Sequence, residues 1–284
     1  MLHRIAQKPA PDELLCLEAT PMRRFLVLVN LYFLIFGSAA WAQTTKRVVD
    51  IPTRPGVTQR FLLLGPAHPK AAVILFAGKH GGLQITSEGR FKWGEDNFLV
   101  RTMEMFAAHG LLTAVVDAPS DRQSDPYLWG FRYKPEHVAD IKAVITWLKQ
   151  QAKVPVWLVG TSMGTQSAAV VAVRLPVAGG GPDGLVLTST ILKIDKGKPV
   201  PDLLLGKIGV PVLVVHHRQD GCEYTPYAEI PSLMDKLSGS PKKELLTVDG
   251  GYNRGNPCDG ITYHGFAGIE KEVVTKIAQW IMAR

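Results

Sequence analysis

The sequence predicts an α/β fold in which a mostly parallel central sheet of about eight strands is flanked by helices. Short apolar runs alternate with longer stretches of helical spacing, a pattern typical of parallel sheets that are covered on both faces. The chain has 284 residues, of which 46% are hydrophobic and 20% charged, the composition of a globular protein with a full core. No internal repeat, low-complexity stretch or long linker interrupts the pattern, so we expect a single domain over residues 43–284.

The first half of the expected sheet contains four strands. The first two, at 48–51 and 59–64, are separated by a turn rich in proline and glycine, with Pro52, Pro55 and Gly56. The apolar run at 72–77 predicts a buried strand that ends in a glycine-rich loop. Helical spacing at 97–109 indicates a helix that Gly110 ends, and a further buried strand follows at 111–116.

The second half alternates strands and helices in the same way. Apolar side chains recur at helical spacing over 135–150, and a strand at 156–159 precedes a helix that includes 167–173. The remaining strands are expected at 185–187, 210–215 and 244–248, and a helix over 265–282 closes the domain. The connection over 188–209 is too short for a large lid domain, whereas the segment 82–96 is a candidate mobile flap.

Residues 22–42 have the pattern of a secretory signal peptide. Two arginines, Arg23 and Arg24, precede an apolar run from Phe25 to Phe36, and Ala40-Trp41-Ala42 follows as a cleavage pattern. The apolar run is shorter than the roughly 20 residues that a membrane span needs. We therefore expect cleavage after Ala42, no stable membrane span after it, and a periplasmic or secreted protein; the alternative is an uncleaved anchor.

We interpret residues 1–21 as an upstream extension, because acidic residues such as Asp12 and Glu18 are unusual before a signal peptide. Our hypothesis is that Met22 is the true start. Cys16 would then be absent, which leaves Cys222 and Cys258 as an even pair in an oxidising compartment. A disulfide between them is the expectation, and two free buried thiols are the alternative.

The formal net charge of +7 does not by itself indicate a partner. Lysine and arginine are scattered along the chain, without a dense basic run or interleaved aromatic residues. The charge therefore indicates a solvated basic surface, and no nucleic-acid partner is expected.

The residues Gly160-Thr161-Ser162-Met163-Gly164 form a G-x-S-x-G motif between a strand and a helix. This is the context of a nucleophile elbow, a sharp turn that lifts a serine clear of the sheet. Side chains at the two glycine positions would collide with neighbouring backbone. The alternative is an ordinary strand-to-helix turn that needs small residues.

An acid and a histidine follow in the order that a serine nucleophile requires. Asp220 comes after the strand at 210–215, and His264 comes after the strand at 244–248. His264 would act as the base that takes the hydroxyl proton of Ser162, and Asp220 would orient its imidazole. Glu223 and Asp259 are alternative candidates for the acid, but their positions after a strand fit this role less well than that of Asp220.

The remaining candidates surround this triad. The backbone N–H of Met163 is expected to stabilise an oxyanion together with that of Gly78, or alternatively Lys79. Lys79 and His80 are candidate substrate-pocket residues, although His80 fits a hydrogen-bonded loop residue equally well. Asp117, at the end of a strand, is expected to form a turn, and a contact with the substrate or with Lys79 is the alternative. Adjacent histidines, His216 and His217, point to opposite faces of a strand, so a shared metal is not expected.

Together, the elbow, the Gly78-Lys79-His80-Gly81-Gly82 loop and the positions of Asp220 and His264 resemble the α/β-hydrolase superfamily, from about Val48 to the C-terminus. Within it, the compact chain without a large lid is similar to exported, dienelactone-hydrolase-like proteins of bacteria. Their namesake uses a cysteine nucleophile where this chain has Ser162. The resemblance implies esterase-like acyl transfer to water.

The expected function is therefore hydrolysis of a small-molecule carboxylic ester through an acyl-enzyme, without cofactor or metal. A serine peptidase or amidase of the same fold is the nearest alternative, since the same triad cleaves amides. A non-catalytic binding protein on this scaffold is an alternative of another class, which the presence of all three triad residue types disfavours.

Overall fold

The computed structural model describes residues 45–195 and 197–283. The expected signal peptide and the extension before it lie outside the described residues. Within them, no helix is long and apolar enough to cross a membrane.

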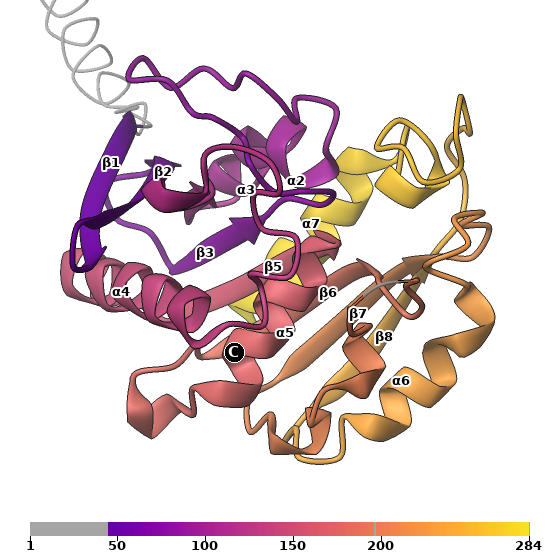
Figure 1. Ribbon diagram of the computed structural model, residues 1–284. Coiled ribbons are helices and arrows are strands. Elements are labelled where there is room, and N and C mark those ends of the chain that lie inside the picture. The colour runs from indigo at the N-terminus through magenta and orange to yellow at the C-terminus, as the bar shows by residue number, and fades with distance from the viewer. Residues whose placement is uncertain (1–44, 196, 284) are drawn as a thin grey trace, which may run out of the picture. The chain divides into compact units, whose positions relative to one another are not determined.

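Eight strands form one sheet in the order β1-β2-β4-β3-β5-β6-β7-β8 (Figure 1). The β1–β2 and β2–β4 pairs are antiparallel, and every other pair is parallel. This is the mostly parallel sheet that the sequence predicts. The strands are β1 (Thr45–Arg54), β2 (Val57–Gly65), β3 (Ala71–Phe76), β4 (Leu111–Val116), β5 (Val156–Ser162), β6 (Gly184–Thr190), β7 (Val212–His217) and β8 (Lys243–Val248).

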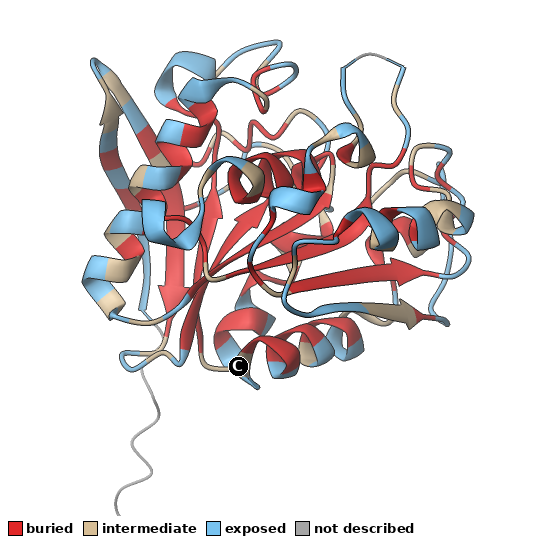
Figure 2. Cartoon of the chain, turned by 90° about the horizontal axis from the view of Figure 1, so that it is seen from below, coloured by how far each residue is buried: buried red, intermediate tan, exposed pale blue. Residues whose placement is uncertain are grey.

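Helices cover both faces of the sheet. On one face α4 (Pro135–Ala152), α5 (Gly164–Arg174) and α6 (Ile230–Lys236) contribute to a common apolar core. The other face packs against α2 (Phe98–Arg101), α3 (Met103–Ala108) and α7 (Glu270–Met282). The central strands are therefore buried on both sides (Figure 2), which explains why β3 is a continuous apolar run and β4 is apolar except for the buried Thr113.

The hairpin of β1 and β2 is longer than predicted. The strands are joined by a tight turn in which Gly56 has a φ of +72°. Pro52, expected in the turn, instead lies within β1, where the pairing register shifts between Pro52 and Arg54. An edge strand tolerates a proline because one side of its backbone has no neighbouring strand.

Two helix predictions need correction, and one helix was missed. The single helix predicted at 97–109 is divided at Thr102, whose Oγ1 donates a hydrogen bond of 2.6 Å to the carbonyl of Phe98. The last helix begins at Glu270 rather than Gly265, because Phe266 and Gly268 have φ values of +59° and +87°. The short α6 was not predicted at all.

The connections near the sheet are short. Between β6 and β7 the described chain forms two single-turn 3₁₀ helices, Val200–Asp202 and Leu205–Lys207, and no large lid. One end of the candidate flap at 82–96 is anchored by the buried carboxylate of Asp117, just after β4. That carboxylate accepts backbone hydrogen bonds of 2.7 to 3.1 Å from three consecutive residues, Leu83, Gln84 and Ile85.

Candidate active site

Ser162 lies on a sharp turn between β5 and α5. Its φ of +52° is in the left-handed region, which a residue other than glycine or asparagine rarely adopts. A Cβ atom at Gly160 would lie 2.6 Å from the carbonyl oxygen of Gly164, and one at Gly164 would lie 2.1 Å from that of Phe76. No side chain fits at either position, so the turn requires both glycines of the G-x-S-x-G motif.

Asp220 and His264 meet although they are 44 residues apart in sequence. Asp220 follows the end of β7, and its Oδ2 lies 3.0 Å from Nδ1 of His264. His264 belongs to a 3₁₀ turn, Tyr263–Gly265, whose first residue is preceded by Thr262. The hydroxyl of Thr262 accepts a hydrogen bond from the His264 backbone N–H at 3.2 Å. Both members of the pair are nearly fully buried, with 9% of Asp220 and 4% of His264 exposed.

The carboxylate of Asp220 is well supplied with donors. Its Oδ1 accepts from the backbone N–H of Cys222 at 3.0 Å, and its Oδ2 accepts from the Thr225 hydroxyl at 2.9 Å. Nε2 of His216 lies 3.5 Å from Oδ2. Burial acts to raise the pKa of Asp220, but the hydrogen bond and charge of His264, with His216 and Cys222, outweigh it and lower the pKa. The carboxylate is therefore ionised at neutral pH.

Ser162 and His264 line the same cavity, whose volume is about 320 Å³. Because His264 contacts Asp220 through Nδ1, its other ring nitrogen, Nε2, can form a hydrogen bond with a second group. Nε2 is buried and has no hydrogen-bond partner among the described residues. The cavity wall consists of Gly78, Lys79, Lys92, Trp93, Gly94, Glu95, Asp96, Asn97, Phe98, Thr161, Ser162, Cys258, Gly260, His264 and Gly265.

Met163 and Gly78, the expected oxyanion donors, are both close to the serine. Met163 directly follows Ser162 and precedes α5, so its N–H lies at the positive end of the helix dipole. Gly78 approaches the serine from the loop after β3. A Cβ atom at Gly78 would lie 3.1 Å from the Cβ of Ser162.

The two candidate pocket residues differ in position. Lys79 lines the cavity and forms a 3.1 Å ion pair with Asp259. His80 is not among the lining residues. Its ring stacks on Tyr127 at a centroid distance of 4.4 Å, contacts Trp93 at 4.0 Å, and accepts a hydrogen bond from the backbone of Gly82. Of the rival acids, Asp259 pairs with Lys79, and Glu223 is exposed; neither contacts the His264 side chain.

The adjacent histidines face apart, as alternation along a strand predicts. They lie at the end of β7, which extends two residues further than expected. His216 contacts the carbonyl of Thr225, whereas His217 contacts that of Gly250 and stacks on Tyr263.

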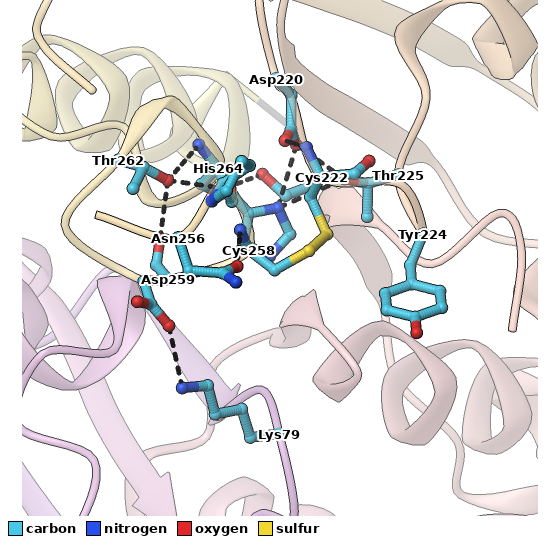
Figure 3. Close-up of a disulfide and its surroundings, with 12 residues drawn as sticks. Lys79, Asp220, Cys222, Tyr224, Thr225, Asn256, Cys258, Asp259, Thr262 and His264 are labelled. Carbon is cyan, nitrogen blue, oxygen red and sulfur yellow. Dashed lines mark hydrogen bonds and ion pairs between the residues drawn. A yellow bond between two sulfur atoms is a disulfide. The ribbon is translucent and has the colours of Figure 1, made fainter. Parts of the chain in front are cut away.

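The predicted disulfide between Cys222 and Cys258 is confirmed (Figure 3). It joins the loop that carries Asp220 to the loop that carries His264, and it lies beside this pair. Cys258 also lines the cavity.

Two contacts of this site were not predicted. Thr225 bonds to Asp220 and lies 3.3 Å from Nδ1 of His264. His216 was considered only as a metal ligand, yet it lies beside the same carboxylate. A threonine five residues after an aspartate is too common to stand out in a sequence, so only the folded loop identifies it.

The strand order and the elbow after β5 define the α/β-hydrolase fold, and the chain has this fold. A dienelactone hydrolase from Anabaena variabilis is similar in structure, with a TM-score of 0.63 and 15% identity over 85% of this chain and 98% of that chain. An esterase of Pyrococcus furiosus has a TM-score of 0.62 and 14% identity over 86% and 93% of the two chains.

A protein described as an α/β serine hydrolase homologue from Coxiella burnetii has a TM-score of 0.56 and 19% identity, over 83% and 97%. At these identities the similarity concerns the fold. No protein-family model and no curated protein matches the sequence.

Proposed function

We propose that the protein is a serine hydrolase that cleaves carboxylic esters through an acyl-enzyme intermediate. The observation that carries the proposal is the orientation of His264. Its Nδ1 is bonded to a buried carboxylate, its Nε2 has no other partner among the described residues, and the residue lines the cavity that Ser162 also lines. An imidazole held in this way is ready to accept a proton from a hydroxyl.

In the first half of the proposed reaction, Nε2 of His264 takes the proton of the Ser162 hydroxyl as its oxygen attacks the ester carbonyl. Asp220 holds the imidazole tautomer and stabilises the imidazolium that forms. The N–H groups of Met163 and of Gly78 or Lys79 would stabilise the negative oxygen. The alcohol then leaves with the proton that His264 returns.

In the second half, a water molecule gives a proton to His264 and attacks the acyl group on Ser162. The carboxylic acid leaves as the serine recovers its proton, so the enzyme is regenerated. The dienelactone hydrolase and esterases of the same fold support an ester as the substrate. A peptidase of this fold would use the same steps on an amide.

The cavity volume of about 320 Å³ favours a small or medium acyl group. We further propose that the protein is exported, since the signal-peptide pattern at 22–42 and the disulfide both fit an oxidising compartment.

Turnover of short p-nitrophenyl esters by the wild type and the Ser162→Ala variant tests the function. We expect wild-type hydrolysis and a loss of at least about 10³-fold in the variant, because the variant lacks the proposed nucleophile. A folded wild type without ester turnover would favour the binding-protein alternative. Faster cleavage of a p-nitroanilide than of the matching ester would favour the peptidase.

A further inference from the structure

The loop after β3 has an unfavourable backbone conformation next to the proposed nucleophile. Lys79 has a φ of +47°, in the left-handed region, although it is not a glycine. Such a conformation persists only where surrounding contacts enforce it, and it is common where a functional geometry must be held. Lys79 follows Gly78 and lines the same cavity as Ser162.

Lys79 is held in this conformation by a contact with Arg132, in the segment before α4. Nη2 of Arg132 donates a hydrogen bond of 2.8 Å to the carbonyl oxygen of Lys79. Gly81 makes the approach possible, because a Cβ atom there would lie 2.6 Å from the same Nη2. The backbone N–H of Leu128 also donates to the next carbonyl, that of His80, at 3.1 Å.

Arg132 is an unusual residue to bury. Only 1% of it is exposed, and it forms no ion pair with a carboxylate among the described residues. Its Nε and Nη1 are buried and have no hydrogen-bond partner there either. Burial lowers the pKa of Arg132 to about 10, so the guanidinium still carries its charge at neutral pH.

A buried charge without a counter-ion destabilises the folded state. Arginine at this position is therefore poorly explained by a contribution to stability alone. What the side chain does provide is a charge-assisted hydrogen bond to one carbonyl, that of a strained residue in the wall of the proposed active site.

We propose that Arg132 is a positioning residue that fixes the loop 78–82 so that the backbone N–H of Gly78 or Lys79 faces the developing oxyanion. This inference rests on the proposed function. The Lys79 carbonyl belongs to the peptide group directly after the one that carries the Lys79 N–H, and two after the one that carries the Gly78 N–H. Fixing this carbonyl therefore restricts the rotation of both candidate donors. A misplacement of about 1 Å in a catalytic group can cost about 10²-fold in rate.

The test compares Arg132→Met, Arg132→Lys and the matched control Arg122→Met. Methionine is of similar length and brings no unpaired charge, which favours folding. The control also removes one arginine charge from the neighbouring surface, since Arg122 lies 4.7 Å from the ring of Phe131. It has no hydrogen bond to the loop 78–82 among the described residues. Near-ultraviolet circular dichroism verifies that each variant is folded.

We expect Arg132→Met to lower kcat for a p-nitrophenyl ester by roughly 10- to 100-fold with KM changed less than about threefold. The affinity for a boronic acid, which mimics the tetrahedral intermediate, should weaken in proportion to kcat/KM. Arg132→Lys should recover part of the loss, and Arg122→Met should behave as the wild type. Unchanged kcat in a folded Arg132→Met variant, or a loss entirely in KM, overturns the inference.

Amide hydrogen exchange gives a readout that does not depend on turnover. Residues 78–82 should exchange faster in Arg132→Met than in the wild type and in Arg122→Met. Equal exchange overturns the positioning role even if the wild type has no esterase activity. An inactive wild type with faster exchange in the variant contradicts the proposed function and leaves the loop-holding role supported.

Discussion

At the scale of single residues, the space around Ser162 is set by glycines. Gly160 and Gly164 are required because side chains there would overlap backbone atoms of the turn and of β3. Gly78 is different, because the two nearest atoms to a Cβ there belong to side chains rather than to the backbone, and both are more than 3.0 Å away. A Cβ atom there meets the Cβ of Ser162 at 3.1 Å and the Asn97 amide nitrogen at 3.2 Å.

This difference gives the first prediction. Gly78→Ala should fold normally but lower kcat/KM by roughly 10- to 100-fold, because the new methyl group crowds the nucleophile and the oxyanion position. Gly209→Ala is the matched control, since nothing lies within 4 Å of a Cβ at that glycine. Steady-state kinetics on a short ester would separate the two variants, and an equal effect of both would contradict the steric argument.

At the scale of elements, α4 carries a buried histidine that takes no part in the proposed chemistry. His137 is 2% exposed, packs against Phe76 and Phe131, and both of its ring nitrogens lack partners among the described residues. Burial, with smaller effects of the charges of Arg132 and Arg54, lowers the pKa of His137 to about 3. His216, at the end of β7, is buried in the same way, and its pKa is lowered to about 4.

These two histidines make stability depend on pH with a definite sign. Between about pH 4 and 6.5 the unfolded chain protonates them and the folded protein does not, so stability falls as the pH falls below about 6.5. The unfolding free energy of the wild type should fall between pH 7.5 and pH 5. In His137→Leu we expect this fall to be smaller by roughly 1–2 kcal/mol. Urea titrations at both values measure this. The exposed His68→Leu control should keep the wild-type dependence, and an unchanged dependence in His137→Leu would refute the account.

The disulfide also acts between elements, because it joins the loop after β7 to the loop before α7. Its sequence separation of 36 residues corresponds to about 3–4 kcal/mol of stability in the chain-entropy treatment. Cys222 also donates its N–H to Asp220, and Cys258 lines the cavity. The bond therefore holds both loops of the proposed acid–base pair.

We predict that the Cys222→Ser, Cys258→Ser double variant is less stable by about 3–4 kcal/mol in chemical denaturation. Its kcat should fall more than its KM rises, because the distance between Asp220 and His264 is no longer fixed. The wild type measured in a reducing agent provides the comparison. If the double variant and the reduced wild type both kept full activity and stability, the disulfide would contribute neither to stability nor to the geometry of the site.

At the scale of the whole described domain, the parallel sheet explains why the residues of the candidate site could be selected from the sequence. Ser162 ends β5, and Asp220 and His264 come after β7 and β8. These strands run in the same direction, so the three residues meet at one edge of the sheet (Figure 1). Apolar runs identify buried strands because both faces are covered, and the motif glycines identify the turn because nothing larger fits.

Features that depend on long-range packing could not be predicted in this way. The division of a helix at Thr102 and the short α6 leave little periodic signal. Two contacts join residues that are far apart in sequence: Arg132 is buried beneath the loop 78–82, and Lys79 pairs with Asp259. Arginine and lysine in loops normally indicate side chains exposed to solvent, so neither contact could be expected.

Covalent labelling with a fluorophosphonate tests the central claim most directly. Peptide mapping by mass spectrometry should find one adduct per chain, on Ser162, and replacing His264 by alanine should slow its formation by orders of magnitude. An adduct on another residue, or none on an intact and folded wild type, would contradict the assignment of Ser162 as a nucleophile activated by His264.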